Sequence, residues 1–148
     1  MSSFLRLWPV AGLAMLAACA STDMGVRTAG DRPEDLSTTE ASFWYQTNEA
    51  ERRLRASGRL NSDPDLNAYV SDMVCEVSGA FCQDLRIYVV ETPNFNASMA
   101  PNGMAVVNTG LLLRAETADQ LGFVLGHEFV HFEENHALER HAALRNAN

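Results

Sequence analysis

Hydrophobic and polar positions repeat along this chain with two different periods, and the first half of the pattern predicts helices. Residues 40–57 place apolar side chains among glutamates and arginines, and Gly58 follows as a helix-ending residue, which predicts a helix. Ser62, Asp63 and Pro64 then supply an N-cap with a proline near the first turn. Apolar residues recur at steps of three and four up to Gly79, so a second helix is expected there.

After Gly79 the pattern changes to the composition of strands. Residues 85–91 are rich in β-branched and aromatic side chains and end at a Thr-Pro-Asn sequence, which predicts a strand. Two further potential strands, residues 96–100 and 103–108, flank Asn102 and Gly103. Asn-Gly is a strong hairpin signal because both residues tolerate positive φ. A small antiparallel sheet is therefore expected, followed at residues 111–113 by a helical turn or a short strand.

A capping box opens the last predicted helix. Thr117 is the N-cap and Gln120 follows three residues later. The helix continues through His127 and His131. The predicted fold class is α+β: N-terminal helices, a small antiparallel sheet with an Asn-Gly hairpin, and a long helix behind it, all within one domain at residues 39–148.

The first residues have the pattern of an export signal. Arg6 precedes an apolar stretch at residues 10–18 that ends in small side chains, which predicts a signal peptide over residues 1–18. A transmembrane helix is the alternative. Pro9 and Gly12 interrupt the stretch, which is shorter than the roughly 20 apolar residues a span requires.

Residues 16–19, Leu-Ala-Ala-Cys, resemble the lipobox of bacterial lipoproteins. The resemblance implies that Cys19 is lipidated and that residues 19–38 form a lipid anchor and a polar tether. Ala20 is not the aspartate that retains lipoproteins at the inner membrane, so the periplasmic face of the outer membrane is the expected location. Ordinary cleavage after Ala20, giving a soluble periplasmic protein, is the alternative.

The net charge limits the partners that the sequence predicts. The 148 residues include 11 basic and 19 acidic side chains, a net charge of −8, and no basic stripe, so nucleic acid is not an expected partner. Membrane contact is expected only through the N-terminal lipid.

Cys75 and Cys82 could form a disulfide in an oxidising compartment; two buried free thiols are the alternative. Their spacing is too long for a tight metal-binding knuckle.

The candidate chemistry lies in a histidine cluster. All four histidines fall between residues 127 and 141. His127 and His131 are four residues apart on the predicted helix, about 40° apart around its axis and about 6 Å along it, so both can reach one zinc ion. Glu128 is rotated by about 100° from His127 and would flank the metal. A carboxylate there can act as general base toward zinc-bound water.

The order of several segments resembles one peptidase family. These segments are residues 96–98, the Asn102-Gly103 turn, residues 106–112, 119–121 and 124–131, and His136. They resemble the gluzincin peptidases that include HtpX, BepA and the CAAX prenyl proteases. The resemblance implies one Zn²⁺ held by His127 and His131, with Glu128 as the catalytic base. It also implies an edge strand at Met104, Val106 and Asn108 that binds misfolded or extended envelope proteins as substrates by strand addition.

The third metal ligand of that family, a glutamate on a later helix, has no counterpart here. Glu134 shares the histidine face but lies roughly 10 Å along the axis from His127. On a continuous helix His136 would face the opposite side, which predicts packing or hydrogen bonding. His141 would approach only if the helix broke near Asn135 or Ala137. Two alternatives to a working enzyme follow: a domain incomplete at its C-terminus, or an inactive, chaperone-like lipoprotein that binds polypeptides.

Overall fold

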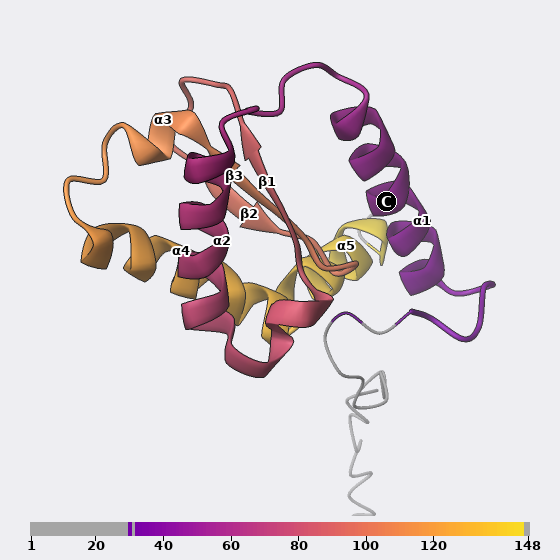
Figure 1. Ribbon diagram of the computed structural model, residues 1–148. Coiled ribbons are helices and arrows are strands. Elements are labelled where there is room, and N and C mark those ends of the chain that lie inside the picture. The colour runs from indigo at the N-terminus through magenta and orange to yellow at the C-terminus, as the bar shows by residue number, and fades with distance from the viewer. Residues whose placement is uncertain (1–29, 31, 147–148) are drawn as a thin grey trace, which may run out of the picture.

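The computed structural model describes residue 30 and residues 32–146. In that part of the chain the elements are α1 (Thr39–Arg55), α2 (Pro64–Ser78), the 3-10 helix η1 (Gly79–Asp84), β1 (Arg86–Val90), β2 (Ala97–Met99), β3 (Met104–Asn108), α3 (Thr109–Leu112), α4 (Ala118–Glu133) and α5 (His136–Asn146). Two α-helices precede the sheet and three follow it (Figure 1). The α+β class expected from the sequence is confirmed.

The sheet is mixed, so the prediction of an antiparallel sheet is wrong. Its strand order is β1-β3-β2, with β3 parallel to β1 and antiparallel to β2. The reason is the connection after β1. Residues 91–96 carry the chain past the position of β3 to the far edge, where it returns as β2 before β3 fills the centre. Hydrophobic patterning predicts strands, but it does not determine which strands become neighbours.

This crossover is fixed to the start of α3. The Thr92 amide donates to Thr109 Oγ1 at 3.1 Å, and Oγ1 donates in turn to the Thr92 carbonyl at 3.0 Å. The Gly110 amide also donates to that carbonyl at 2.8 Å. A Cβ at position 110 would lie 2.3 Å from the carbonyl carbon and oxygen of Pro93, so only glycine permits this approach. The loop is therefore held where β1 and β3 end.

The turn between β2 and β3 uses Asn102 and Gly103 in different ways. The Gly103 amide donates to the Ala100 carbonyl at 2.9 Å, and the Ala100 amide donates to the Met104 carbonyl at 2.8 Å. Gly103 has a φ of 82°, whereas Asn102 does not have positive φ. This is a three-residue hairpin loop with glycine in the left-handed position. Asn102 instead contributes a buried side chain that is 3% exposed.

The core lies between one face of the sheet and the helices α2 and α4 (Figure 1). Side chains alternate between the two faces of a strand, so every second residue of each strand enters this core. The helices supply rows of apolar side chains spaced by three and four residues. The largest fully buried side chains are Phe132, Leu111, Leu125, Val70, Val74, Val89 and Val107. Their packing fixes the orientation of α4.

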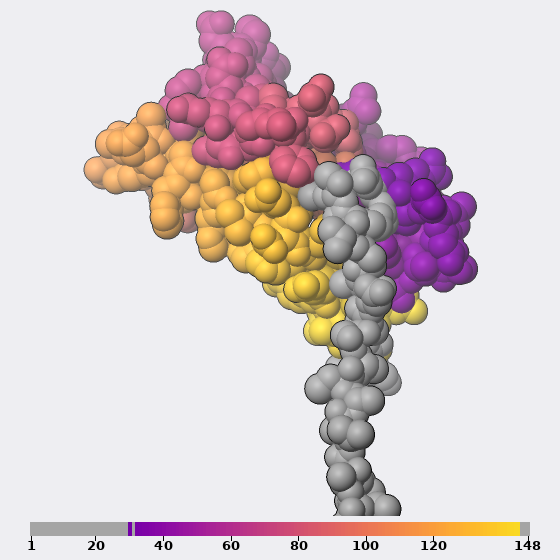
Figure 2. Space-filling model, turned by 90° about the horizontal axis from the view of Figure 1, so that it is seen from below, coloured from indigo at the N-terminus to yellow at the C-terminus, as the bar shows by residue number. Residues whose placement is uncertain are grey.

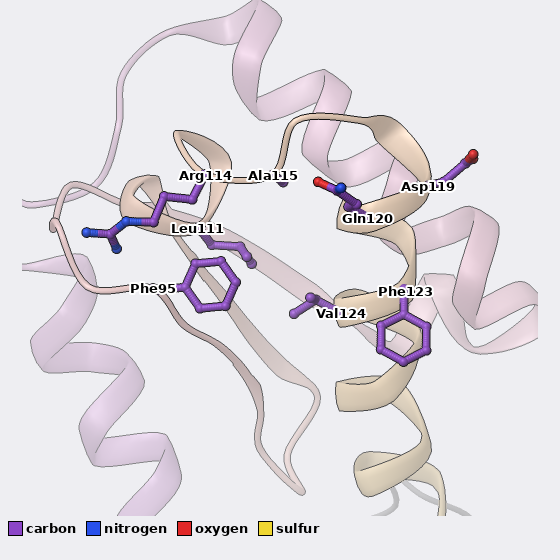
Figure 3. Close-up of a pocket in the computed structure, with 8 residues that line it drawn as sticks. All are labelled: Phe95, Leu111, Arg114, Ala115, Asp119, Gln120, Phe123 and Val124. Carbon is purple, nitrogen blue, oxygen red and sulfur yellow. The ribbon is translucent and has the colours of Figure 1, made fainter.

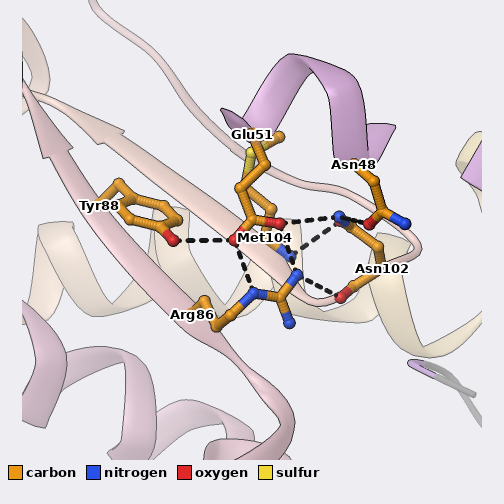
Figure 4. Close-up of polar contacts among 6 residues, drawn as sticks. All are labelled: Asn48, Glu51, Arg86, Tyr88, Asn102 and Met104. Atoms are coloured by element: carbon orange, nitrogen blue, oxygen red, sulfur yellow. Dashed lines mark hydrogen bonds and ion pairs between the residues drawn. The ribbon is translucent and has the colours of Figure 1, made fainter. Parts of the chain in front are cut away.

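The opposite face of the sheet meets α1 through a polar cluster around Glu51 (Figure 4). Arg86 donates from Nε and Nη2 to the two carboxylate oxygens of Glu51 at 2.6 and 2.7 Å. The Tyr88 hydroxyl donates to the same carboxylate at 2.8 Å, and Asn102 Nδ2 donates at 3.0 Å. Arg86 holds the pKa of Glu51 below its usual value, and burial raises the pKa of Tyr88. Glu51 therefore joins α1 to β1 and to the hairpin turn.

The two ends of the described chain meet where α1 and α5 lie side by side (Figures 1 and 2). The Phe43 ring stacks on His141 with a centroid distance of 4.3 Å. No helix among residues 32–146 is both long enough and apolar enough to cross a bilayer. The predicted signal peptide at residues 1–18 and the predicted lipidation site Cys19 lie outside the described residues, which include only the last part of the predicted tether.

Candidate active site

The face of α4 that carries the candidate chemistry is set by capping and by burial. Thr117 Oγ1 accepts from the Gln120 amide at 3.2 Å, and Gln120 Oε1 accepts from the Glu116 amide at 2.8 Å. From this start, α4 turns one stripe toward the sheet: Leu121, Leu125, Phe129 and Phe132 are buried. The helical period then places His127 and His131 on the side away from this stripe, where His127 is exposed and His131 is partly buried, whereas Glu128 borders the stripe and is partly buried.

His127 and His131 have a spacing suited to one metal ion. Their Nε2 atoms are 3.1 Å apart, and their rings are nearly perpendicular, at 86°. Two nitrogen ligands bound to tetrahedral zinc at about 2.0–2.1 Å are separated by about 3.3–3.4 Å. The two imidazoles therefore fit adjacent positions of such a site with a shift of a few tenths of an ångström. This agreement is independent of the sequence motif, because it depends on the side-chain rotamers as well as the spacing.

His136 joins this pair through a break in the helix. α4 ends at Glu133, and Asn135 has a φ of 55°, so α5 begins in a new direction at His136. His136 Nδ1 thereby lies 2.8 Å from His131 Nδ1. The expectation of a continuous helix with His136 on its far side is wrong. The signal in the sequence was Asn135, since asparagine can adopt the left-handed conformation that ends many helices.

The contact between His131 and His136 determines which nitrogen of His131 is available. If Nδ1 of His131 carries the proton and donates to His136 Nδ1, Nε2 is left as an unprotonated ligand atom. Metal-binding histidines usually donate their second ring N–H to such a partner, which fixes the ring and the tautomer. The hydrogen-bonding role predicted for His136 is thus confirmed, whereas its partner, His131, was not predicted. His141 lies elsewhere, stacked on Phe43 of α1.

The described residues bring together two candidate metal ligands at this position. Within residue 30 and residues 32–146, no group of three or more His, Cys, Asp or Glu side chains is arranged to hold a metal ion. Glu134, considered from the sequence as a possible third ligand, is the C-cap residue of α4 and is exposed. His127 and His131 are therefore the two candidate ligands that the described residues supply for one metal ion.

The strand predicted as the substrate edge is in the wrong place. Met104, Val106 and Asn108 belong to β3, which is the central strand and pairs on both sides. Its backbone groups are already used, because β1 and β2 flank it. The prediction failed for the same reason as the antiparallel sheet: the crossover puts β2, not β3, at an outer position.

β2 instead has an edge without a sheet partner among the described residues. The Asn108 amide donates to the Asn96 carbonyl, and the Ala100 amide donates to the Met104 carbonyl. Hydrogen-bonded pairs in an antiparallel ladder alternate, so Ser98 exchanges both of its bonds with Val106. The amides and carbonyls of Ala97 and Met99 consequently point away from β3. β2 also packs against α4, which carries the histidines.

Cys75 and Cys82 are joined by a disulfide in the structure. Cys75 is on α2 and Cys82 is in η1, so the bond ties the end of the helix to the turn that leads into β1. The two sulfurs are therefore not metal ligands. Their role is to stabilise the layer that supports α4 from the side of α2.

The chain resembles known metallopeptidases in sequence. A family model described as peptidase family M48 matches residues 60–147. The human (Homo sapiens) mitochondrial metalloendopeptidase OMA1 is 30% identical over 105 residues, which cover 71% of this chain and 20% of that protein. The Bos taurus protein of the same name is 46% identical over 54 residues, which cover 36% of this chain and 10% of the relative. The chain thus spans a fifth or less of the length of these relatives.

Proposed function

The chain belongs to peptidase family M48, and on that premise we propose that it is a zinc-dependent endopeptidase in which His127 and His131 hold the metal and Glu128 is the general base. The observation that supports this proposal most directly is the 3.1 Å separation of the two Nε2 atoms. Bound zinc would supply a Lewis acid that lowers the pKa of a water molecule to about 7.

The residues of the chain have separate tasks in this reaction. Glu128, next to His127 on α4, accepts the proton of the attacking water and passes it to the leaving amine. His136 holds His131 by the 2.8 Å contact between their Nδ1 atoms, and with the Nδ1 proton of His131 donated in this contact its Nε2 would be free to hold the metal. β2 is the outer strand of the described sheet, and its edge at Ala97 and Met99 is the position where an extended polypeptide can add as a further strand.

Main-chain pairing of this kind recognises conformation more than sequence. We therefore propose extended or misfolded proteins as the substrates. With the predicted lipobox at Cys19, the site of action would be the bacterial envelope, at the periplasmic face of the outer membrane. The chemistry proposed for the residues of α4 does not depend on the substrate class or on the location. Each of these two proposals can therefore be tested separately from the peptidase activity.

A second candidate function is polypeptide binding without turnover. It is favoured by one observation: the described residues bring together two metal ligands, whereas catalytic zinc normally has three protein ligands and a water. With two imidazoles, zinc retention is expected to be weaker than at a three-ligand site. Competition with a chelating dye measures this directly.

The deciding experiment compares zinc content and casein hydrolysis in matched variants. Glu128→Gln is expected to keep the metal and to lose at least about 100-fold in hydrolysis, the usual contribution of a general base. Glu133→Gln, an exposed position on the same helix, is the control and should change neither quantity. His127→Ala and His131→Ala should each lose the metal. Hydrolysis that survives in Glu128→Gln would refute the enzyme proposal, and casein capture without cleavage by the unaltered chain would favour the binding function.

A further inference from the structure

Large exposed apolar side chains line two separate depressions of the described residues. Phe95 and Phe123 line a cavity of about 420 Å³ between the crossover loop, α3 and the first turns of α4, one helical turn before His127 (Figure 3). Leu36 and Tyr45 line the other depression, of about 380 Å³, at the start of α1. Figure 1 shows α1 and the first turns of α4 at opposite sides of the molecule. The depression beside α1 is therefore not part of the candidate active site.

The segment before α1 holds Leu36 in its exposed position. Ser37 donates from its amide and its hydroxyl to Asp35 Oδ1 at 2.8 and 2.7 Å. The Thr38 hydroxyl donates to the Asp35 carbonyl at 3.0 Å and accepts from the Ala41 amide at 3.1 Å as the N-cap of α1. Leu36 lies in this turn and is 71% exposed. The turn and the helix cap therefore fix a large apolar side chain in solvent.

Trp44 lines two depressions of opposite character. It forms part of the apolar depression of Leu36 and Tyr45, and part of a larger polar one, of about 650 Å³, whose walls include Arg52 and Arg55. The indole is partly buried, and Tyr45 is 65% exposed. Tryptophan and tyrosine are enriched at membrane–water boundaries, where one side of the ring is apolar and the other is wet. Leu36, Trp44 and Tyr45 together form what we call the N-terminal face.

The chain between the predicted lipid and this face is short. Cys19 precedes Arg32 by 13 positions, and a chain of that length spans at most about 47 Å when fully extended. A lipid at Cys19 keeps the N-terminal face close to the leaflet, at a high effective concentration. A contact too weak to bring the free domain to a membrane is then sufficient to orient the anchored one.

The charges around the face do not favour an electrostatic contact with a membrane. Arg32 is exposed, but so are the neighbouring Glu34 and Asp35. The whole chain has a net charge of −8, which is repelled by anionic lipids. A contact made by this face therefore depends on its apolar and aromatic side chains.

We propose that the N-terminal face docks on the phospholipid leaflet that holds the lipid of Cys19, with Leu36, Trp44 and Tyr45 at the boundary between headgroups and acyl chains. The inference rests on the proposed membrane location and is independent of peptidase activity. A tether alone leaves the domain free to rotate. Docking holds it in one orientation relative to the leaflet.

Trp44 is itself the probe for the test. The sequence contains two tryptophans, and Trp8 leaves with the predicted signal peptide, so Trp44 is the only one in the mature chain. Cys75 and Cys82 form a disulfide, which leaves Cys19 as the single thiol. The mature chain is coupled through that thiol to a maleimide-bearing lipid in vesicles of phosphatidylethanolamine and phosphatidylglycerol. The phospholipids carry bromine, a quencher of indole fluorescence, either near the headgroups or deep in the acyl chains.

Bromine near the headgroups should quench Trp44 relative to unbrominated vesicles, and deep bromine should quench it less. Leu36→Ser and Tyr45→Ser should each weaken docking by roughly 10-fold, read from the quenched fraction, since each removes one large apolar contact. Quenching in the unaltered chain should persist at high salt, which screens charges but not apolar contacts. Phe123→Ser is the matched control: it removes an apolar side chain that is 79% exposed on α4, and it should leave quenching unchanged.

Three results would overturn the inference: no quenching of Trp44, quenching that Leu36→Ser and Tyr45→Ser leave unchanged, and quenching that high salt abolishes. Sedimentation of the uncoupled chain adds a fourth. A dimer that Leu36→Ser dissociates would assign the face to a second copy of the chain instead of a leaflet. Because the anchor is supplied chemically, absence of natural lipidation shows in palmitate labelling and not in this measurement. Failure of the proposed location and failure of docking are therefore distinguishable.

Discussion

The polar cluster around Glu51 leads to a quantitative prediction for stability. Glu51→Gln keeps the size of the side chain but removes the charge that accepts two bonds from Arg86. Breaking one partner of a fully buried ion pair costs about 3–5 kcal/mol, whereas an exposed pair contributes about 0–1 kcal/mol. The carboxylate is 9% exposed and the Arg86 side chain 44%. The expected loss in the free energy of unfolding is therefore intermediate, about 2–3 kcal/mol at pH 7.

The same reasoning fixes the sign of the pH dependence. Arg86 lowers the pKa of Glu51 in the folded state relative to its usual value of 4.5. A lowered folded-state pKa means that the stabilisation is fully present above pH 4.5 and is lost as the pH falls through the folded pKa. The difference in stability between wild type and Glu51→Gln should therefore shrink in that acid range.

Urea denaturation measures this difference at pH values stepped from 7 to 3. Glu76→Gln, on the exposed side of α2, is the control and should change stability by less than about 0.5 kcal/mol. A loss below about 0.5 kcal/mol for Glu51→Gln at pH 7 would refute the role assigned to the cluster. So would a loss that stays constant down to pH 3.

Three further sets of predictions concern five individual positions. Gly110→Ala should lower the free energy of unfolding by about 1–3 kcal/mol, because its Cβ would meet backbone atoms. Gly126→Ala should stabilise α4 by up to about 1 kcal/mol, because its Cβ would meet nothing within 4 Å. Urea denaturation measures both changes. Asn135→Val should lower the free energy of unfolding by about 1–2 kcal/mol, because valine is disfavoured at positive φ, and it should weaken zinc retention. His136→Leu should weaken zinc retention by about 10-fold, and His136→Asn should restore part of it. Competition with a chelator measures zinc retention in all three variants. Cys19→Ala should abolish palmitate labelling and move the protein out of the membrane fraction.

Each of these has an outcome that would contradict it. Equal stability of the two glycine variants would mean that the crossover does not approach position 110 closely. Unchanged zinc retention in His136→Leu would make its contact with His131 incidental. Labelling that persists in Cys19→Ala, or unlabelled soluble wild-type protein, would exclude lipidation at that residue.

Local signals in the sequence were sufficient for most elements. The caps at Asp63 and Thr117 formed as expected, and each uses its side chain to accept from amides of the first helical turn. Strand pairing was not predictable in the same way, because the neighbour of a strand depends on the path of its connections. The Glu51 cluster was also not predicted. It joins Glu51 to Arg86 and Asn102, which lie 35 and 51 positions further along the chain, and no local pattern links residues that far apart.

The candidate site likewise has one part that local sequence predicts and another part that it does not. His127, Glu128 and His131 lie within one helix, so the directions in which they leave it follow from the helical period, whereas the 3.1 Å separation of the two Nε2 atoms also depends on the rotamers. His136 depends on the conformation of one residue, Asn135, and the cavity beside Phe95 depends on how three segments meet. The family membership is shown by the match to residues 60–147, whereas the closer likeness to the HtpX and BepA branch remains a prediction.

The central position of β3 has a consequence for the order in which the chain assembles. Residues 98 and 106 of the hairpin pair across a short loop, whereas residues 86 and 104 of the parallel pair close a longer one. Shorter loops lose less entropy on closing, so β2 and β3 can associate first and β1 joins them afterwards. A bound substrate strand would then extend the earliest-formed part of the sheet. Substrate recognition would then involve β2 and β3, the strands paired by the most local contacts. It would not depend on the contact with α1, which forms later.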